Sequence, residues 1–344
     1  MAATLLLIAC AAAASAVLLW VSCSGLGDSS QRLADHYGIP DIVKGSVITA
    51  IASSIPEFVT AVLAIPVHGD FELGLAAIIG SAIYNVLVIP ACSVFARGRS
   101  LQANRELIFR EALFYLVSVV VLLLVICLAV VYDGVGADAG AGVRGTFTRP
   151  LALLPLLLYG LYLFMQYEEV RDHRQKVARV PGIDPARQWL ILVLCIGLIC
   201  VGVEVLLRCA IALGELLETP TFLWGMTMVA AATSIPDTLI SVKEAKLGRT
   251  DASVSNVLGS NVFDLLVAVP VGVLIAGSVS VSFTQTVPMM SFLVLATIVL
   301  LVFMRRDMEL THREASFMLL LYLAFGLWMA TEAFGITRVL GLPY

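Results

Sequence analysis

The chain has 344 residues, of which 60% are hydrophobic and 13% are charged, and its mean hydropathy is +0.98. A soluble domain carries about 25% charged residues, so this composition predicts an integral membrane protein rather than a soluble enzyme or binding module. The formal net charge is only −4 and the basic residues form no patch beyond short connections, which gives no support to nucleic-acid binding.

Hydropathy predicts ten membrane-spanning segments, because a helical span needs about 20 predominantly apolar residues. In chain order they cover residues 3–23, 42–66, 72–96, 107–131, 150–167, 189–213, 221–245, 252–277, 283–304 and 314–335. No basic region precedes the first segment, so we expect it to be retained as a span rather than removed as a signal peptide. The predicted fold class is therefore an all-α membrane protein with ten transmembrane helices.

The basic residues of the connections alternate along the chain. Taken in turn, the connections of one set hold 2, 4, 5, 3 and 3 of the 21 Lys and Arg residues, 17 in all, whereas the other set, with the C-terminus, holds 3. The remaining one, Arg208, lies inside the sixth segment. Cytoplasmic loops carry an excess of Lys and Arg. The richer set is thus predicted to be cytoplasmic, with both termini outside a cell membrane.

The ten segments divide into two halves of five, residues 1–167 and 188–344, joined by a basic cytoplasmic linker at 168–187. Since five is an odd number, the second half must cross the membrane in the opposite direction to the first. Similar sequences in the two halves would then form an inverted structural repeat, whose equivalent parts meet near the middle of the bilayer.

One short pattern occurs in both halves, about 180 residues apart. The first copy contains Ser53-Ser-Ile-Pro-Glu57 and the second contains Thr233-Ser-Ile-Pro-Asp237. Proline removes a backbone N–H, and its ring clashes with the carbonyl one turn back. Each copy therefore predicts a broken helix, whose freed carbonyls must face protein, water or an ion rather than lipid. Carbonyl, hydroxyl and carboxylate oxygens are the ligands that hard cations such as calcium prefer.

Each copy is followed by a Gly-Ser pair and, four residues after the serine, by an amide or an acid. These residues are Gly80, Ser81 and Asn85 in the first half and Gly259, Ser260 and Asp264 in the second. Residues spaced i and i+4 share one face of a helix, and glycine allows another helix to approach closely. The segments are thus predicted to enclose a small polar pocket.

Most of these residues also have an ordinary structural interpretation. Ser, Thr and Gly in membrane helices commonly serve packing, with the hydroxyl bonded to the carbonyl four residues back, and a proline kink is common as well. The acids Glu57, Asp237 and Asp264 differ, because an intramembrane acid without a basic partner is costly and marks a functional site. Glu204 and Arg208, spaced i and i+4, are expected to pair with each other.

The remaining cysteine, histidine and acidic residues predict no further site. The seven cysteines contain no CxxC pair and are expected to be small apolar residues, not a disulfide or zinc framework. No histidine cluster indicates a transition metal, and we expect no cofactor. Acids near the ends of the predicted spans are expected to be solvated: Glu106, Glu111, Glu215, Glu218 and Glu332.

The two copies resemble the alpha repeats of the calcium/cation antiporter superfamily, whose best-known members are the sodium/calcium exchangers. The stretches Ala230–Asp237, Gly259–Asp264 and Gly80–Asn85 are most similar to the potassium-dependent branch. The ten spans, outside termini and inverted halves agree with that family, so the resemblance covers the whole membrane domain. It implies a sodium-driven calcium antiporter in the lipid bilayer, not an enzyme, with calcium and sodium as the transported ions.

The resemblance also implies a role for each position of the repeats. Glu57 and Asp237 correspond to the central carboxylates that bind calcium and, alternately, sodium. Carbonyl oxygens are implied as ligands at Ser53 and Thr233 for calcium and at Ala50 and Ala230 for outer sodium sites. Sodium-binding hydroxyls are implied at Ser54, Ser81, Ser234 and Ser260, with Asn85 and Asp264 lining the pocket.

Several positions depart from the family pattern. Ala52 and Ala232 stand where the family usually has Gly, and Ala76-Ala77 stands where many members have Gly-Asn or Gly-Thr. Asp237 is shorter than the usual prokaryotic Glu and matches the potassium-dependent branch. An acid at the position of Asp264 accompanies potassium coupling in that branch but also occurs in some potassium-independent members, so potassium is a further candidate ion.

Other functions are compatible with parts of the sequence. Potassium-dependent exchange and calcium/proton antiport are alternatives in the same fold, although the calcium/proton branch carries a different acidic motif. An intramembrane hydrolase with an aspartyl dyad, a channel and a scaffold without transport are alternatives of other classes. Paired Ser-Ile-Pro-acid patterns suit ion ligation better than water activation, and an inverted repeat favours two gates over one open path. The oligomeric state is left open, with a monomer as one arrangement that fits.

Overall fold

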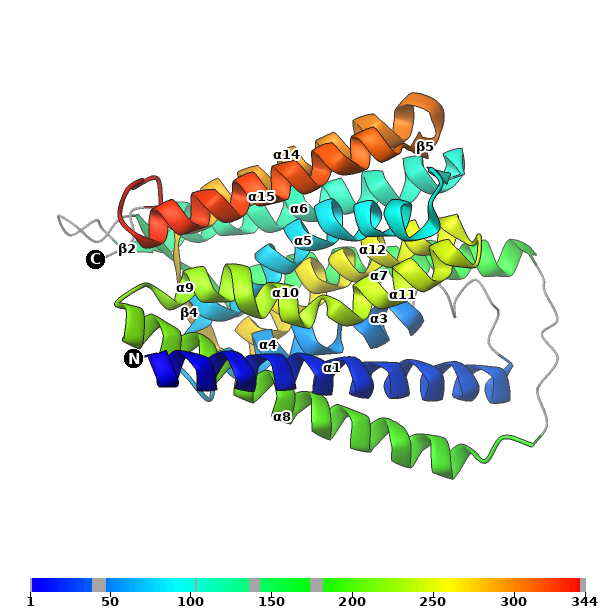
Figure 1. Cartoon of the computed structure of the whole chain (residues 1–344), viewed down its shortest axis with the longest axis horizontal. Coiled ribbons are helices and arrows are strands. Elements are labelled where there is room, and N and C mark those ends of the chain that lie inside the picture. Colours follow the sequence, from blue (N-terminus) through cyan, green and yellow to red (C-terminus); the bar gives the residue numbers. More distant parts are fainter. Residues whose placement is uncertain (1, 39–47, 103, 136–142, 174–181, 341–344) are drawn as a thin grey trace.

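The computed structural model describes residues 2–38, 48–102, 104–135, 143–173 and 182–340. Within those ranges eight helices are long and apolar enough to cross a membrane, and each overlaps one predicted span. Two shorter apolar helical segments, Ile55–Ala64 and Thr221–Thr233, lie within the second and seventh predicted spans. The chain is a predominantly helical membrane protein (Figure 1).

The two halves of the chain have the same order of elements: a long helix, a broken helix and three further helices. The first half consists of α1 (Ala2–Tyr37), α3 (Ala50–Ser53), α4 (Ile55–Ala64), α5 (Phe71–Arg97), α6 (Arg105–Asp133) and α7 (Arg149–His173). The second consists of α8 (Pro185–Leu217), α9 (Thr221–Trp224), the π-helical turn η2 (Gly225–Val229), α10 (Ala230–Thr233), α11 (Ile235–Lys246), α12 (Thr250–Phe263), the π-helical turn η3 (Asp264–Ala268), α13 (Val269–Ala276), α14 (Phe283–Asp307) and α15 (His312–Ala333).

Some helices are longer than the apolar segments that predicted them. Helix α1 has 36 residues and continues through polar residues to Tyr37, well beyond the predicted end at 23. Hydropathy predicts only the part of a helix that lies in the apolar layer. The helix itself continues until the backbone adopts a non-helical conformation. Here that happens at Gly38, whose φ of 71° is in the left-handed region that glycine adopts at helix ends.

Helix α5 and the run α12–η3–α13 lie at the centre of the bundle and are buried over most of their length. Helices α1 and α8 lie side by side at its edge (Figure 1) and pack along each other. Leu19 and Val203 from this pair join a second apolar cluster with Val59 of α4 and Val229 of η2. The two broken helices are thus held between the central helices on one side and the α1–α8 pair on the other.

The part of the chain that the structure describes contains five short strands, which the all-α prediction did not anticipate. Strand β1 (Leu101–Gln102) pairs with β5 (Glu309–Leu310), and β3 (Arg144–Thr148) pairs with both β2 (Gly134–Val135) and β4 (Ser278–Ser282), all antiparallel. They have two to five residues in connections between helices, too short to give a hydropathy signal. The two sheets lie at opposite ends of the bundle (Figure 1), which we call the β5 end and the β4 end.

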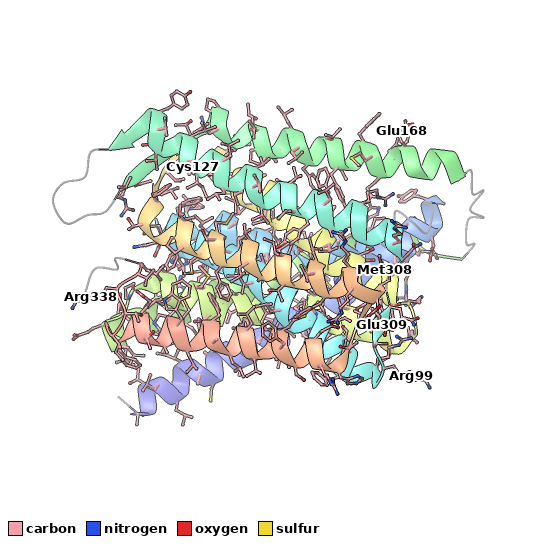
Figure 2. The ribbon with its side chains drawn as sticks, turned by 90° about the horizontal axis from the view of Figure 1, so that it is seen from above. Arg99, Cys127, Glu168, Met308, Glu309 and Arg338 are labelled. Carbon is pink, nitrogen blue, oxygen red and sulfur yellow. The ribbon has the colours of Figure 1, made fainter. Side chains whose placement is uncertain are left out.

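The pairing of these strands crosses between the two halves of the chain. The connection between α5 and α6 pairs with the connection between α14 and α15 at the β5 end. At the β4 end, the connection between α13 and α14 pairs with the one between α6 and α7. At each end, the connection between the third and fourth spans of one half therefore pairs with the connection between the fourth and fifth spans of the other half. Figure 2 shows Arg99 and Glu309 at the β5 end and Arg338 at the other.

Candidate functional site

Both Ser-Ile-Pro patterns form helix breaks with the same backbone geometry. Helix α3 ends before Ser54 (φ −90°, ψ 5°) and α10 ends before Ser234 (φ −81°, ψ 0°), and a new helix starts at the next residue in each case. The proline is near the first position of each new helix, where its missing N–H is tolerated. The predicted breaks are thus confirmed, and they place Glu57 and Asp237 in the first turn of α4 and α11.

Glu57 is held by hydroxyls from both halves of the chain. Ser81 Oγ of α5 donates to Glu57 Oε1 at 3.2 Å, and Ser234 Oγ from the second helix break lies 3.4 Å from the same oxygen. The two hydroxyl oxygens are 2.7 Å apart. Glu57 is 1% exposed, and its other oxygen, Oε2, has no hydrogen-bond partner. One carboxylate oxygen is therefore fixed in place and the other is available.

Asp237 is also held by a group from the other half of the chain. Asn85 Nδ2 of α5 donates to Asp237 Oδ2 at 3.1 Å. Asp237 is completely buried, and Oδ1 has no hydrogen-bond partner. Asn85 Oδ1 is likewise buried without a partner. Two oxygens beside this acid are thus free to accept a cation.

Asp264 is the most isolated of the three acids. It is completely buried, and neither carboxylate oxygen has a hydrogen-bond partner. It begins the π-helical turn η3, and π-bulges are frequent at functional sites. No sequence signal predicted this turn or η2. Of the ion pairs found among the described residues, none involves Asp264, Glu57 or Asp237.

Three hydroxyls make the bond to their own helix that the ordinary interpretation expects. Ser53 donates to Thr49 O and Ala50 O, and Thr233 donates to Val229 O and Ala230 O, at 3.1–3.2 Å. Ser260 donates to Asn256 O at 2.7 Å. Their oxygen lone pairs remain able to accept a cation.

The carbonyls of Ala50 and Ala230 are occupied in this conformation. Each accepts the hydroxyl described above, and each also accepts a backbone N–H at 3.1 Å, from Ser54 and Ser234 respectively. These two carbonyls are therefore less available to a cation than the carboxylate oxygens.

Asn261 belongs to this site, although sequence reasoning missed it. It is completely buried, its Oδ1 accepts from Asn85 Nδ2 at 3.0 Å, and its Nδ2 donates to Ala82 O and Tyr115 OH, both at 3.2 Å. It lies one residue after Ser260 and does not share the face of the i, i+4 pair, so the helical spacing excluded it. Its effect is to fix the amide of Asn85 with nitrogen toward Asp237 and oxygen free.

Gly80 allows the helices around the site to approach closely, as predicted. A Cβ at Gly80 would lie 2.2 Å from Met226 O and 2.8 Å from Ala230 Cβ. Helix α5 therefore crosses η2 and α10 almost backbone to backbone, next to Ser81. For Gly259 the close approach stays a prediction.

Within the described residues, no three His, Cys, Asp or Glu side chains cluster closely enough to hold a metal ion by themselves. Hydroxyl and amide groups from both halves of the chain contact Glu57 and Asp237. A cation here would need those neutral oxygens to complete its shell.

Predictions for acids outside the pocket are partly confirmed. Arg208 Nε donates to Glu204 Oε1 at 2.7 Å, which confirms that pair. Glu215 and Glu218 are exposed, as expected. Glu111 is 3% exposed and accepts from Tyr162 and Gln166 of α7, and Glu332 is buried and accepts the N–H groups of the chain end. Their predicted solvation is wrong, because side chains of another helix donate to Glu111 and backbone groups seven and eight residues further along the chain donate to Glu332. The side chain of Glu106 lies outside the described residues.

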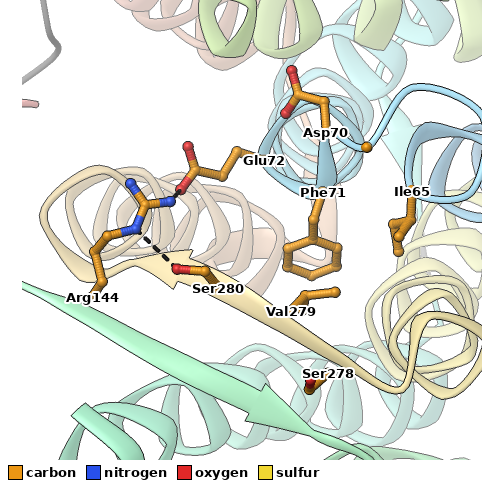
Figure 3. A pocket seen from close by; sticks show the side chains of 9 residues that line it. Ile65, Asp70, Phe71, Glu72, Arg144, Ser278, Val279 and Ser280 are labelled. Atoms are coloured by element: carbon orange, nitrogen blue, oxygen red, sulfur yellow. Dashed lines mark hydrogen bonds and ion pairs between the residues drawn. The ribbon is translucent and has the colours of Figure 1, made fainter. Parts of the chain in front are cut away.

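A separate hollow of about 350 Å³ opens at the β4 end (Figure 3). Its charged groups are already partnered: Arg144 pairs with Glu72 and donates to Ser280 Oγ, and Asp70 caps α5 and accepts from Thr221. It therefore lacks the unpartnered oxygens of the central pocket.

Comparisons with known proteins agree with this geometry. A family model described as sodium/calcium exchanger protein matches residues 7–168 and 187–331. The inner membrane protein YrbG of Escherichia coli is 27% identical over 266 residues, covering 75% of this chain and 77% of that protein. The human sodium/potassium/calcium exchanger 5 is 25% identical over 338 residues, covering 69% and 64%.

Among solved structures, the fold is similar to that of the sodium-calcium exchanger NCX_Mj soaked with Na+ and Sr2+. The TM-score is 0.63 at 21% identity, and the match covers 93% of this chain and 97% of that one. Because the family model matches most of the chain, the membership is clear: the chain belongs to the sodium/calcium exchanger family of membrane transporters and is not an enzyme.

Proposed function

We propose that this protein exchanges sodium for calcium across a cell membrane, by alternating access to the pocket between α3–α4, α5, α10–α11 and α12–η3. The observation that carries the proposal is the pair Glu57 and Asp237. Each acid is buried at a helix break, each keeps one carboxylate oxygen without a partner, and neither has a basic neighbour in an ion pair. Buried carboxylates left uncompensated are strongly destabilising, so a bound cation is the natural compensation.

The chemistry of the pocket fits calcium and sodium. Both are hard cations that prefer oxygen ligands, and calcium in particular favours carboxylates. The proposed ligand set comprises Ala50, Ser53, Ser54, Glu57, Ser81, Asn85, Ala230, Thr233, Ser234, Asp237, Ser260 and Asp264. All twelve are at most 2% exposed. Among these twelve, the side-chain oxygens without a hydrogen-bond partner belong to Ser54, Glu57, Asn85, Asp237 and Asp264, and these are the first to be expected around an ion.

An inverted repeat of five spans, residues 1–167 and 188–344 with the linker 168–187, supports alternating access. The two halves have the same order of elements, and their connections pair with each other in exchanged roles at opposite ends. That is what a twofold axis in the membrane plane produces. The basic connections predicted to be cytoplasmic include Arg99, at the β5 end, whereas Arg338 lies at the other (Figure 2). The β5 end is therefore assigned to the cytoplasm and both termini to the outside.

Calcium-45 uptake into proteoliposomes under an imposed sodium gradient tests this function. Glu57→Gln and Asp237→Asn should each abolish sodium-driven uptake, because each removes one charge from a divalent site at nearly constant shape. Glu204→Gln is the matched control, since Glu204 is also in a membrane helix but pairs with Arg208 away from the pocket. Near-normal uptake in either pocket variant contradicts the assignment.

Coupling to an additional cation is favoured by one observation, the two unpartnered oxygens of Asp264. Asn85 occupies the equivalent place in the first half, so the two halves differ there in formal charge. If potassium balances Asp264, wild-type transport requires potassium and Asp264→Asn removes that requirement. If Asp264 is protonated, the variant is nearly silent and potassium has no effect.

Uptake with potassium replaced by choline, in wild type and Asp264→Asn, separates these two cases. Loss of all transport in the variant under both conditions contradicts both. Calcium/proton antiport predicts instead that a proton gradient alone drives uptake without sodium.

A further inference from the structure

A line of buried polar side chains continues from the central pocket toward the β5 end. It consists of Ser93 on α5, Ser241 on α11, and Ser253 and Asn256 on α12, and we call it the polar seam. Each of the four residues is at most 2% exposed. Asn256 Nδ2 donates to Ser241 Oγ at 3.1 Å, and Ser253 Oγ donates to Ser93 Oγ at 3.3 Å. Asn256 Oδ1 is buried without a hydrogen-bond partner.

The polar seam begins one helical turn beyond the proposed ion ligands. Ser241 follows Asp237 by four residues and Asn256 precedes Ser260 by four, so each pair shares a helical face. Ser260 Oγ also donates to Asn256 O at 2.7 Å. At its far end α12 contacts strand β1. The polar seam thus leads out of the pocket toward one particular end of the protein.

The other half of the chain lacks these polar groups at the equivalent positions. Counting from Glu57 and Asp237, and from Ser81 and Ser260, the counterparts of Ser241, Asn256 and Ser253 are Ala61, Ala77 and Gly74. There the helices pack tightly: a Cβ at Gly74 would lie 2.9 Å from Ala64 Cβ and 3.5 Å from Ala61 Cα. Small apolar residues are therefore sufficient for this helix packing in the first half. The hydroxyls and the amide at the equivalent positions of the second half are not needed for it.

The buried hydroxyls and amide of the polar seam disfavour folding if no ligand binds to them. A buried carbonyl oxygen without a partner, such as Asn256 Oδ1, loses the hydrogen bonds that it makes with water in the unfolded chain. The counterpart residues would avoid the cost while filling the equivalent space in the other half. The polar seam contains an unpaired oxygen and three hydroxyls, and it leads from the central pocket toward the β5 end. Together these features indicate a route for a ligand that moves along the polar seam.

We propose that the polar seam is a transit site for a monovalent cation, sodium in the exchange proposed above, between the central pocket and the β5 end. Its oxygens are neutral, so they can replace part of the hydration shell of a monovalent ion without holding it strongly. An ion on a conduction route must bind well enough to enter and weakly enough to leave. Calcium, which favours charged oxygens, is left to the carboxylates of the pocket. This inference rests on the proposed function.

Asn256→Ala and Ser241→Ala test the proposal, because each installs the residue found at the counterpart position. The control is Ser118→Ala on α6, where a fully buried serine donates only to its own helix at Phe114 O. Calcium-45 exchange is measured in inside-out and right-side-out membrane vesicles while sodium is varied on one face at a time. Thermal melting of each purified variant reports folding separately.

Loss of one neutral ligand is expected to raise the half-saturating sodium concentration at the β5 face about five- to tenfold in Asn256→Ala. Asn256→Ser, which keeps an oxygen and is the more conservative change, should give a smaller shift. At the β4 face, and in equilibrium calcium binding, the change should stay within about twofold.

An equal shift at both faces, or none at either in variants that fold, overturns the proposal and leaves the polar seam a packing feature. Should Asn256→Ala fail to fold, Asn256→Ser and Ser241→Ala decide by the same criteria. Wild-type vesicles without sodium-driven exchange would instead refute the proposed function, and the transit site with it.

Discussion

Replacing Gly80 by alanine should push apart the helices around the proposed site without changing the side chain of any proposed ligand. The added Cβ would lie 2.2 Å from Met226 O, whereas real Cβ atoms keep at least 3.0 Å from other heavy atoms. The obstruction is a backbone carbonyl, which cannot rotate away as a side chain can. Helix α5 and the second broken helix must therefore separate by about 0.8 Å, the difference between these two distances.

That separation is enough to break the contacts that join the two halves. The Ser81–Ser234 distance would grow from 2.7 Å to about 3.5 Å, and the Asn85–Asp237 distance from 3.1 Å to about 3.9 Å, beyond hydrogen-bonding range. Two buried polar pairs left unsatisfied cost about 1–3 kcal/mol each, against a gain of about 0.5–1 kcal/mol for alanine over glycine in a helix. The expected net loss of stability is about 1–5 kcal/mol.

Thermal unfolding in detergent, with and without calcium, measures this effect alongside calcium-45 uptake. Gly80→Ala should melt earlier than wild type, gain less from calcium and transport poorly. Gly160→Ala on α7 is the control, because a Cβ there meets nothing within 4 Å, and it should melt no earlier than wild type. A Gly80→Ala protein with wild-type melting and uptake would show that the close helix crossing does not position the site.

Three further predictions follow from contacts outside the ligand set. Asn261→Ala should weaken equilibrium calcium binding about five- to tenfold, because Asn85 loses the partner that fixes its amide. Tyr115→Phe removes only the hydroxyl to which Asn261 donates, and it should have a smaller effect. An unchanged affinity in Asn261→Ala contradicts the positioning role. Arg144→Ala should lower the melting temperature by leaving the partly buried Glu72 unpaired, and adding Glu72→Gln should recover part of the loss if that pair is the cause. Cysteines placed at Arg99 and Arg338, which lie at opposite ends of the bundle (Figure 2), should react with an impermeant maleimide from the cytoplasmic and outer faces respectively, and labelling of both from one face would contradict the ten-span topology.

The sequence predicted the breaks in the helices and the burial of the acids because both follow from local chemistry. Proline cannot continue a helix without losing a hydrogen bond, so the interruptions at Ser54 and Ser234 are fixed by the next two residues. A carboxylate within an apolar segment must be buried when that segment spans the membrane. These inferences needed no knowledge of which helices are neighbours.

Features that depend on neighbours were missed. Asn261 enters the site only because α6 and α5 bring Tyr115, Ala82 and Asn85 against it. Glu111 is buried because Tyr162 and Gln166 of α7 donate to it. The strands likewise depend on pairing between connections distant in sequence. The π-helical turns η2 and η3 were missed because their residues continue the helical hydropathy pattern.

The two halves share a backbone plan but differ in charge and polarity, and this difference bears on how the exchanger works. In the two repeats, Glu57 corresponds to Asp237, Asn85 corresponds to Asp264 and Ala82 corresponds to Asn261. With all three acids ionised, one calcium ion leaves one negative charge, so a further cation or a proton must accompany it for full neutralisation, whereas three sodium ions neutralise the pocket alone. The extra acid on the second half therefore links ion selectivity to charge balance. Three of the four residues of the polar seam belong to the same half, so the proposed transit site would make the route of exchange differ between the two ends of the protein.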